Sequence, residues 1–217
     1  PADRQSWRVA GFVEAHDATR RKVEWNVASW LDDDREFEEN LPADEILVAG
    51  GSVLLSPWFG VGDGAQAGIE LSGGAPGGDP TFARARVTGR TILPLFAGLR
   101  LGAEAAAGHA WGGLPTQYHW FLGGVETLRG YDIGDAAGST MARARAELTR
   151  GTLAIGLALF ADAGWASNDA DSFDADDALL SGGLGVTFMD GLVRIDVARA
   201  FVSPTGWRVH LHLNSLL

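Results

Sequence analysis

The sequence contains no cysteine and only one lysine, Lys22, among its 217 residues. Without cysteine the chain can form neither a disulfide framework nor a thiolate metal site, and it has no cysteine nucleophile. A phosphate loop of the form G-x-x-x-x-G-K-[ST] cannot be built around Lys22, so the glycine-rich stretches "GGAPGG" and "LGGVETLRG" are not phosphate loops. These absences remove thiol chemistry and nucleotide binding from the candidate functions.

Positive charge is also scarce, and the formal net charge is −11. A nucleic-acid-binding protein needs a basic face, so we expect no nucleic-acid partner. The chain has no run of about 18 apolar residues, which excludes a membrane-spanning helix. It begins at Pro1 without a signal peptide, and we expect it to be a mature part of a longer protein.

The dominant pattern in the sequence is an alternation of apolar and polar residues. In "TMARARAELTR", residues 140–150, the polar and charged side chains mostly occupy the odd positions, and alanine and leucine occupy even ones. A β-strand directs successive side chains to opposite faces, so this segment predicts one apolar and one charged face. The same alternation recurs in "FARARVTGR", "LVRIDVARAF" and "WRVHLHLN".

Eleven segments show this strand pattern, and most are longer than the roughly 5–6 residues of an ordinary soluble strand. Their lengths match the ~9–11 residues that a tilted strand needs to cross a bilayer. Short turns alternate with long, often acidic connections, as in bacterial outer-membrane barrels. The predicted strands span residues 6–17, 22–31, 46–59, 65–74, 81–95, 99–111, 140–150, 153–167, 179–189, 192–202 and 207–215.

The alternation favours a membrane barrel over a soluble sandwich or lipocalin-like barrel. The charged faces could not pack against a second sheet without stranding charges in an apolar core. We therefore predict an all-β, antiparallel transmembrane β-barrel domain over residues 1–217, with apolar residues outward and polar residues inward. A complete barrel has an even number of strands, so eleven strands predict either that one or more N-terminal strands are missing from this chain or that one of the eleven is not a strand. Aromatic residues near strand ends are expected to form interfacial girdles, namely Trp7, Trp30, Trp58, Phe59, Trp111, Trp120, Trp165 and Trp207.

The most specific stretch is "FLGGVETLRGYDIGD", residues 121–135, whose "LRGY" motif is Leu128, Arg129, Gly130 and Tyr131. Five predicted strands follow it. Together with "ELTR", "LFADAG", "SGGLGVTF", "VRIDVARAF" and "WRVHLHL", it makes residues 108–217 similar to the C-terminal barrel half of the bacterial surface antigen superfamily. This superfamily includes the outer-membrane barrel-assembly factor and the two-partner secretion translocators. The resemblance implies a sixteen-stranded barrel in the bacterial outer membrane, preceded by periplasmic domains that this chain lacks.

The resemblance also implies roles for individual residues. The motif lies on a long outer loop that folds back into the barrel, where Arg129 would pair with Glu147 and Asp162 on the inner wall. The alternation independently places both carboxylates on the inward faces of adjacent strands. A guanidinium moved out of bulk water requires such partners. Glycines would allow tight reversals of the loop, and Phe121 and Tyr131 would fill the space between loop and wall; the glycines are Gly123, Gly124, Gly130 and Gly134.

From the resemblance we expect a protein that helps to insert proteins into, or move them across, a bacterial outer membrane. Its expected partners are outer-membrane lipid, an unfolded or secreted polypeptide substrate, accessory periplasmic proteins and, through self-association, a second copy. Two alternatives stay open. The barrel could anchor a secreted patatin-type lipase, or it could be a passive porin or adhesin.

We expect no enzyme activity, catalytic residue, metal or cofactor. Ser203, His210 and Asp196 lie on or near neighbouring predicted strands, but nothing in the sequence activates the serine. His210 and His212 share a strand face and could bind a metal, although filling of the polar inner wall is the stronger interpretation. The acidic run "DDDREFEEN" could bind calcium, although a solvated loop is the stronger interpretation.

Overall fold

The computed structural model describes residues 6–16, 46–56, 65–76, 82–152, 154–189 and 192–213. Within these residues ten strands form one antiparallel sheet, in which each strand is hydrogen-bonded to its neighbours in chain order. The strands are β1 (Ser6–His16), β2 (Ile46–Ser56), β3 (Gln66–Pro76), β4 (Phe82–Pro94), β5 (Leu99–Gly112), β8 (Thr140–Gly151), β9 (Ile155–Ser167), β10 (Leu179–Phe188), β11 (Val193–Ala200) and β12 (Gly206–Leu213).

Smaller elements occupy the connections. Two short strands, β6 (Trp120–Leu122) and β7 (Ala136–Gly138), pair with each other in a separate two-stranded sheet. The described residues also form four short 3-10 helices, η1 (Phe96–Gly98), η2 (Thr116–Tyr118), η3 (Ala170–Ser172) and η4 (Ala175–Asp177). No helix in the described part of the chain is long and apolar enough to cross a membrane.

Ten of the eleven predicted strands are present, with boundaries that differ by a few residues. The remaining one, 22–31, lies outside the described residues. Strand β1 pairs directly with β2 along its whole length, from Ser6 opposite Ser56 to His16 opposite Ile46. The sheet therefore has an even number of strands, and the odd count that predicted missing N-terminal strands is not observed in the described part of the chain.

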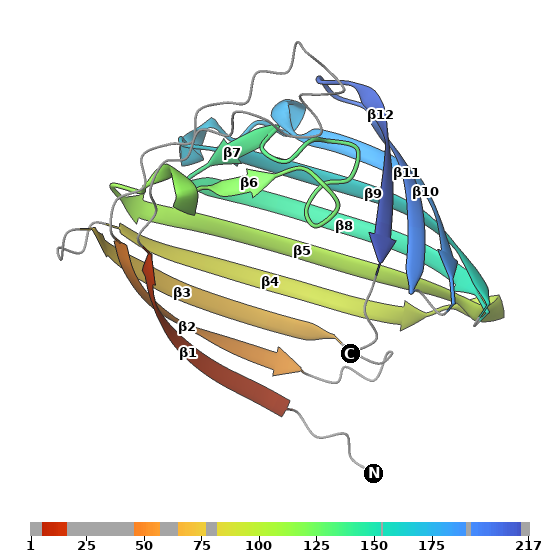
Figure 1. Ribbon diagram of the computed structural model, residues 1–217, viewed down its shortest axis with the longest axis horizontal. Helices are drawn as coiled ribbons and strands as arrows, with labels where there is room; N and C mark the ends of the chain where they lie inside the picture. The colour runs from red at the N-terminus through yellow and green to blue at the C-terminus, as the bar shows by residue number, and fades with distance from the viewer. Residues whose placement is uncertain are drawn as a thin grey trace.

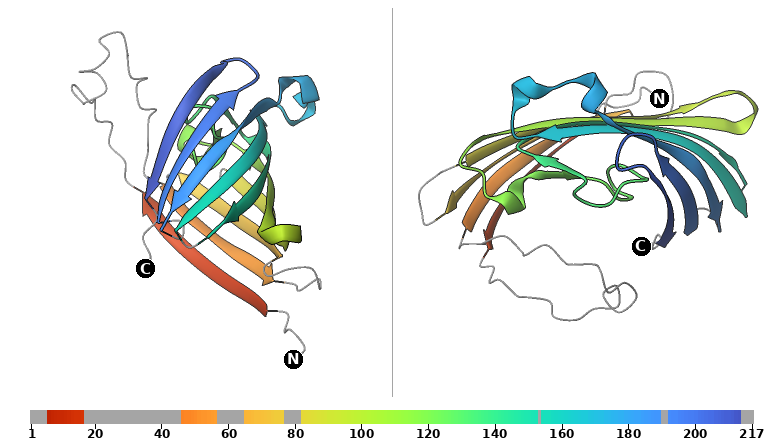
Figure 2. Two further views of the ribbon diagram at one scale, coloured as in Figure 1. Left: turned by 90° about the vertical axis from the view of Figure 1, so that its right-hand side faces the viewer. Right: turned by 90° about the horizontal axis from the view of Figure 1, so that it is seen from above.

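The sheet is strongly curved, and the segment that contains β6 and β7 lies on its concave side (Figures 1 and 2). We call this concave side the inner face. Within the described sheet β1 and β12 each have one hydrogen-bonded neighbour, so the sheet is open between them. The connections after β4 and β8 are short, whereas those after β5 and β9 are long and lie at the opposite end of the strands. This alternation is typical of outer-membrane barrels.

The two faces of the sheet differ as the alternation predicts. Aliphatic side chains on the outer face are well exposed, as shown by Leu157 and Leu184, which are each 63% exposed. A continuous exposed apolar surface is rare on a soluble protein but is what a lipid-facing wall requires. The predicted fold class, an antiparallel transmembrane β-barrel with a polar inner face, is confirmed.

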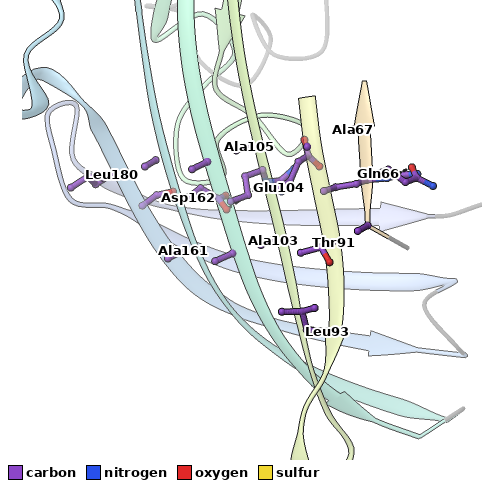
Figure 3. Close-up of a pocket in the computed structure, with 18 of the residues that line it drawn as sticks. Gln66, Ala67, Thr91, Leu93, Ala103, Glu104, Ala105, Ala161, Asp162 and Leu180 are labelled. Atoms are coloured by element: carbon purple, nitrogen blue, oxygen red, sulfur yellow. Dashed lines mark hydrogen bonds and ion pairs between the residues drawn. The ribbon is translucent and has the colours of Figure 1, made fainter. Parts of the chain in front are cut away.

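The strand register arranges outer-face residues in rows across the sheet. One row consists of small residues directly opposite one another, namely Ala67, Gly89, Ala105, Ala144 and Ala163. A parallel row further along the strands carries large side chains, namely Leu93, Leu101, Leu148, Leu159 and Leu184. The small residues leave a shallow hollow of about 970 Å³, part of whose lining is seen in Figure 3. Along this row of small residues the side chains therefore extend only a short distance from the sheet.

The five tryptophans within the described residues fall into two groups. Trp7, Trp111 and Trp207 are exposed and occupy outer-face positions at or near strand ends, where an interfacial girdle lies. Trp120 and Trp165 are buried instead. The girdle prediction also covered Trp30, Trp58 and Phe59, which are outside the described residues.

The two buried tryptophans have aromatic or cationic partners that cover them. The ring of Trp120 lies under the Arg84 guanidinium, with 3.9 Å between Cζ and the ring centroid. The ring of Trp165 is met edge-on by Phe173 from the connection after β9, with centroids 5.1 Å apart. The girdle prediction is wrong for Trp120, because β6 belongs to the segment on the inner face rather than to the wall.

Candidate functional site

The "LRGY" motif lies in the connection between β6 and β7, in a stretch from Gly123 to Asp135 that we call the inner loop. Within it the Leu128 N–H donates to Gly124 O at 3.0 Å, and the Gly124 N–H donates to Tyr131 O at 2.7 Å. The Thr127 hydroxyl accepts from the Gly123 N–H at 2.9 Å and donates to Gly123 O at 2.7 Å. These bonds close the inner loop on itself and leave the motif side chains free to contact the sheet.

Two glycines make this compact shape sterically accessible. Gly123 has a φ of 121°, and a Cβ there would lie 1.7 Å from Asp132 O, so no other residue fits. Gly130 has a φ of 90°, and a Cβ there would lie 3.1 Å from Ser181 Cβ and 3.2 Å from the Ala200 nitrogen. The backbone at Gly130 therefore lies directly against β10 and β11.

Arg129 forms its principal contact with Asp162 of β9. Its Nε donates to Asp162 Oδ2 at 2.8 Å, and its Nη2 donates to Oδ1 at 2.7 Å. The backbone N–H of Arg129 also donates to Oδ2, at 3.1 Å. Both residues are only 3% exposed. Such a buried, bidentate, charge-assisted pair is among the stronger hydrogen-bonding arrangements in proteins.

Glu147 of β8 provides the second carboxylate. Arg129 Nη1 donates to Glu147 Oε2 at 2.8 Å. The structure thus brings together all three residues for which the sequence predicts a contact, Arg129, Glu147 and Asp162. Arg194 of β11 donates to both oxygens of the same carboxylate, each at 2.7 Å, and its Nε donates to Asp196 Oδ1 at 2.8 Å.

Arg145 of β8 adds a third guanidinium. Its Nε lies 3.5 Å from Asp162 Oδ1, while its Nη1 and Nη2 donate to the backbone carbonyls of Glu126 and Val125 at 3.0 and 3.1 Å. Three arginines thus face three carboxylates in a group that we call the ion cluster: Arg129, Arg145, Arg194, Glu147, Asp162 and Asp196. Balanced charge is what a buried ionic group requires.

The guanidinium of Arg129 also lies over an aromatic ring. Its Cζ is 3.5 Å from the ring centroid of Phe160, which comes from the inner face of β9. Burial by itself would lower the pKa of Arg129, but hydrogen bonds and charges from Asp162 and then Glu147 outweigh it and raise the pKa. Arg129 therefore stays protonated while buried, so the inner loop is held by permanent charge.

Leu128 and Tyr131 dock the other side of the motif. Both are fully buried and belong to an apolar cluster with Leu179 and Ala200. The Tyr131 hydroxyl oxygen lies 2.9 Å from the carbonyl oxygens of both Leu180 and Val202, to which it can donate. Tyr131 thus joins the inner loop to β10 and to the residues after β11.

Phe121, by contrast, is 40% exposed, so the prediction that it fills the space against the wall is wrong. The adjacent Leu122 is almost fully buried, and its Cδ1 lies close to Gly164 of β9. Alternation within the short strand β6 explains the difference, because neighbouring residues of a strand point in opposite directions.

The last strand of the sheet also holds the inner loop. Arg208 of β12 donates to both carboxylate oxygens of Asp132, from Nε at 2.8 Å and from Nη2 at 2.7 Å. Its Nη1 donates to the carbonyl oxygen of Gly130. The inner loop therefore contacts residues of β8, β9, β10, β11 and β12.

Sequence reasoning missed several members of this site, including Arg194, Arg145 and Arg208. Each lies at an inward position of the alternating pattern. The pattern therefore predicts that these side chains lie on the inner face, but it does not predict which carboxylate each of them contacts. Asp196, considered above with Ser203 and His210 for a hydrolase, belongs to the ion cluster instead. His212 Nε2 lies 3.3 Å from Asp196 Oδ2. Among the described residues no group of three or more potential ligands could hold a metal ion.

A curved antiparallel sheet with an apolar outer face, and an inner loop fixed to the charged inner face by a buried arginine, are the features of an outer-membrane-type β-barrel with a loop folded onto its inner wall. The Omp85 superfamily domain matches residues 61–207, which is more than half of the chain. The chain therefore belongs to the Omp85 superfamily, and the resemblance to the bacterial surface antigen superfamily is confirmed. This superfamily acts in the insertion and translocation of polypeptides at the outer membrane. A comparison with curated proteins finds no match.

Proposed function

We propose that this chain forms the barrel wall and plug of a protein that inserts polypeptides into the bacterial outer membrane or moves them across it. The observation that carries this proposal is the seating of the "LRGY" loop by Arg129 against Asp162 and Glu147. A loop held by several charge-assisted hydrogen bonds occupies the inner space of the barrel. A loop bonded in this position is expected in a barrel that opens only when a substrate passes. It is not expected in a permanently open pore.

The proposed mechanism uses the edges of the sheet as well as the loop. Strands β1 and β12 each have an unpaired edge in the described sheet. Unpaired N–H and C=O groups favour the addition of a further strand, so a substrate segment would pair there before it enters the membrane or crosses it. Because Arg208 joins β12 to Asp132 and Gly130, the seated loop would fix the orientation of that edge.

The remaining partners follow from the same proposal. The apolar outer face contacts outer-membrane lipid, and the polypeptide substrate is received on the inner face or at the open edge. Accessory periplasmic proteins would deliver the substrate, and a second copy of the chain could pair with the open edge. We assign no catalytic residue, and in the described part of the chain the buried Nε2 of His210 has no hydrogen-bond partner, Ser203 included.

The proposal is tested by Arg129→Ala in the full-length protein, with Arg199→Ala as the control. Arg199 lies on the outer face, where its guanidinium stacks on Trp207 at 5.4 Å, and only its backbone lies beside the inner loop, at Gly130. Arg129→Ala should abolish substrate insertion or secretion and expose the inner loop to protease, whereas Arg199→Ala should leave both unchanged. Normal activity together with an unchanged protease pattern in Arg129→Ala would refute the proposal.

Conductance in planar bilayers distinguishes the alternative roles. A plugged barrel should conduct poorly and should gain conductance on Arg129→Ala. A passive porin would conduct at a high level with Arg129 intact. A lipase anchor would show a plugged barrel but would not support the insertion or secretion of any polypeptide other than its own attached domain.

A further inference from the structure

Three arginines on the inner face of β4 differ from those of the ion cluster. They are Arg84, Arg86 and Arg90, which we call the β4 arginine strip. Within the described ranges, no Asp or Glu oxygen lies within 4.0 Å of their guanidinium nitrogens. The Nε atoms of Arg84 and Arg86 are buried and have no hydrogen-bond partner. Arg90 Nε donates to the neutral amide oxygen of Gln66 at 2.6 Å.

Carboxylates lie near the strip, and the charge of Glu70 acts on Arg84, but none of them forms an ion pair with the strip in the described part of the chain. The Arg84 guanidinium lies over the ring of Trp120, which supports the cation through its π face but leaves the N–H groups available. Glu70 is the register partner of Arg86 on β3, yet it forms no ion pair with it. Glu104, the nearby carboxylate of β5, is paired with Arg143.

The strip opens onto space inside the barrel. One cavity of about 310 Å³ is lined by Gln66, Arg86, Thr88, Arg90 and Glu104, together with Leu54 and Gly89. A second cavity of about 270 Å³ shares Arg90 and Glu104 with the first and extends to Arg129, Arg145 and Glu147. Arg86 and Arg90 of the β4 arginine strip therefore border a path that leads to the ion cluster under the inner loop.

The spacing of the strip matches an extended polypeptide. Residues i and i+2 of a strand lie on one face about 6.6–6.8 Å apart, which is also the spacing of alternate side chains in an extended peptide. Carboxylates at alternate positions of a peptide could thus meet Arg84 and Arg86 in turn. A partly desolvated guanidinium whose Nε has no hydrogen-bond partner gains from a carboxylate that bonds to it.

We propose that the β4 arginine strip binds an acidic, extended segment of the polypeptide that this barrel handles. The inference rests on the proposed function and names the class of substrate segment: a stretch with Asp or Glu at alternate positions. The segment would lie along β4 with its carboxylates on the strip and would reach the ion cluster at its Arg90 end. Carboxylates arriving there would compete with Asp162 and Glu147 for the arginines that hold the inner loop.

Binding is tested with the full-length protein in detergent and fluorescent peptides of the repeats Asp-Gly, Asn-Gly and Lys-Gly, by fluorescence anisotropy. We expect the Asp-Gly peptide to bind, the other two not to bind, and binding to weaken with salt. The double variant Arg84→Gln/Arg86→Gln should weaken binding about 100-fold, from roughly tenfold for each charge-assisted contact. The control Arg199→Gln should stay within about twofold of the unmodified chain.

The position of the peptide is tested by single-cysteine labelling, since the chain has no cysteine of its own. Thr88→Cys places a thiol on the inner face between Arg86 and Arg90, and Val87→Cys places one on the outer face. A bromoacetyl Asp-Gly peptide should react with the thiol at position 88 but not with that at position 87. The heat-sensitive gel mobility of the folded barrel, measured for both variants, checks that each of them is folded.

Several outcomes would refute the binding of an acidic segment by the β4 arginine strip. These are equal binding of the acidic and neutral peptides, unchanged binding by the double variant, and displacement of the peptide by inorganic phosphate at an equal concentration, which would indicate a general anion site. If substrate insertion or secretion depends on Arg129 but the acidic peptide does not bind as expected, the proposed role of the strip is refuted and the proposed function stands. If Arg129→Ala changes neither transport nor the protease pattern, the proposed function fails independently of peptide binding.

Discussion

Arg129 and Arg194 converge on a single carboxylate, that of Glu147. Arg129 reaches it from the inner loop at 2.8 Å, and Arg194 reaches it from β11 with two bonds of 2.7 Å. Each arginine also bonds to a second carboxylate, Asp162 in the case of Arg129 and Asp196 in the case of Arg194. The shared carboxylate links the loop to the wall, and the separate ones hold each arginine in place.

The two carboxylates that hold Arg129 should differ in importance. The Asp162 side chain is 0% exposed and accepts three hydrogen bonds from Arg129, so Asp162→Asn leaves a buried guanidinium without its bidentate partner. We expect a loss of about 3–5 kcal/mol in the free energy of loop opening. The Glu147 side chain is 23% exposed and both its partners keep another acid, so Glu147→Gln should cost about 1–3 kcal/mol.

Amide hydrogen exchange of the inner loop measures this difference, because exchange of Gly124 and Leu128 reports the opening of their internal hydrogen bonds. A larger effect of Glu147→Gln than of Asp162→Asn would contradict the assignment of Asp162 as the principal partner.

The glycines of the inner loop provide a test of sterics against backbone strain. Gly123→Ala should prevent the loop from seating, because the new Cβ would overlap Asp132 O at 1.7 Å. Gly134 has a similar positive φ of 94° but open surroundings, since an added Cβ would lie 3.9 Å from Phe121 Cδ1, so Gly134→Ala should cost only about 1–2 kcal/mol of strain. Limited proteolysis of the loop should therefore be faster in Gly123→Ala than in Gly134→Ala. Equal proteolysis of the two variants would show that the contact at Asp132 is unimportant.

Removal of one oxygen atom tests the docking of Tyr131. Tyr131→Phe keeps the buried ring but leaves the carbonyls of Leu180 and Val202 without the hydroxyl, at a cost of about 1–3 kcal/mol. We expect faster amide exchange at Leu180 and Val202, whose nitrogens lie 3.2 Å from the hydroxyl oxygen. The control Phe121→Leu alters a half-exposed ring and should leave these amides unchanged. No acceleration in Tyr131→Phe would mean that packing alone docks the ring.

Arg208 should affect orientation more than stability. The Asp132 side chain is 59% exposed, so loss of its pair with Arg208 should change stability by only about 0–1 kcal/mol. Arg208→Gln should nevertheless broaden the distance distribution between spin labels at Ile133→Cys and Val209→Cys, since the tie between inner loop and β12 is lost. The same labels with Arg199→Gln should keep a narrow distribution. An unchanged distribution in Arg208→Gln would contradict the coupling of loop and edge strand.

Much of this arrangement could be predicted because the strands of a transmembrane barrel alternate regularly between lipid-facing and inward-facing residues. Alternation with a period of two gives both the strands and the inward faces of Glu147 and Asp162, and the order of strands makes them neighbours. The partners of Arg194 and Arg208 could not be predicted. Their contacts depend on how the curved sheet brings β8 and β11 together and on the path of the inner loop, neither of which leaves a periodic signal.

The short elements escape prediction for a related reason. Strands β6 and β7 have three residues each, which is too short to show alternation, so residues 111–139 have the pattern of a long loop alone. The sequence consequently places Trp120 at the membrane interface, although it lies beneath Arg84 on the inner face. Local pattern identifies a wall residue only when the surrounding segment is long enough to establish that it belongs to the wall.

The burial of Arg129 sets an order of events during folding. Its carboxylate partners come from β8 and β9, and Tyr131 docks on β10 and beyond β11. Burying a guanidinium costs free energy unless its carboxylate partners are already in place. The loop can therefore dock only after these strands have been assembled. Docking of the loop thus depends on correct assembly of the C-terminal strands. In a barrel with a misplaced strand the loop would not dock on the inner face.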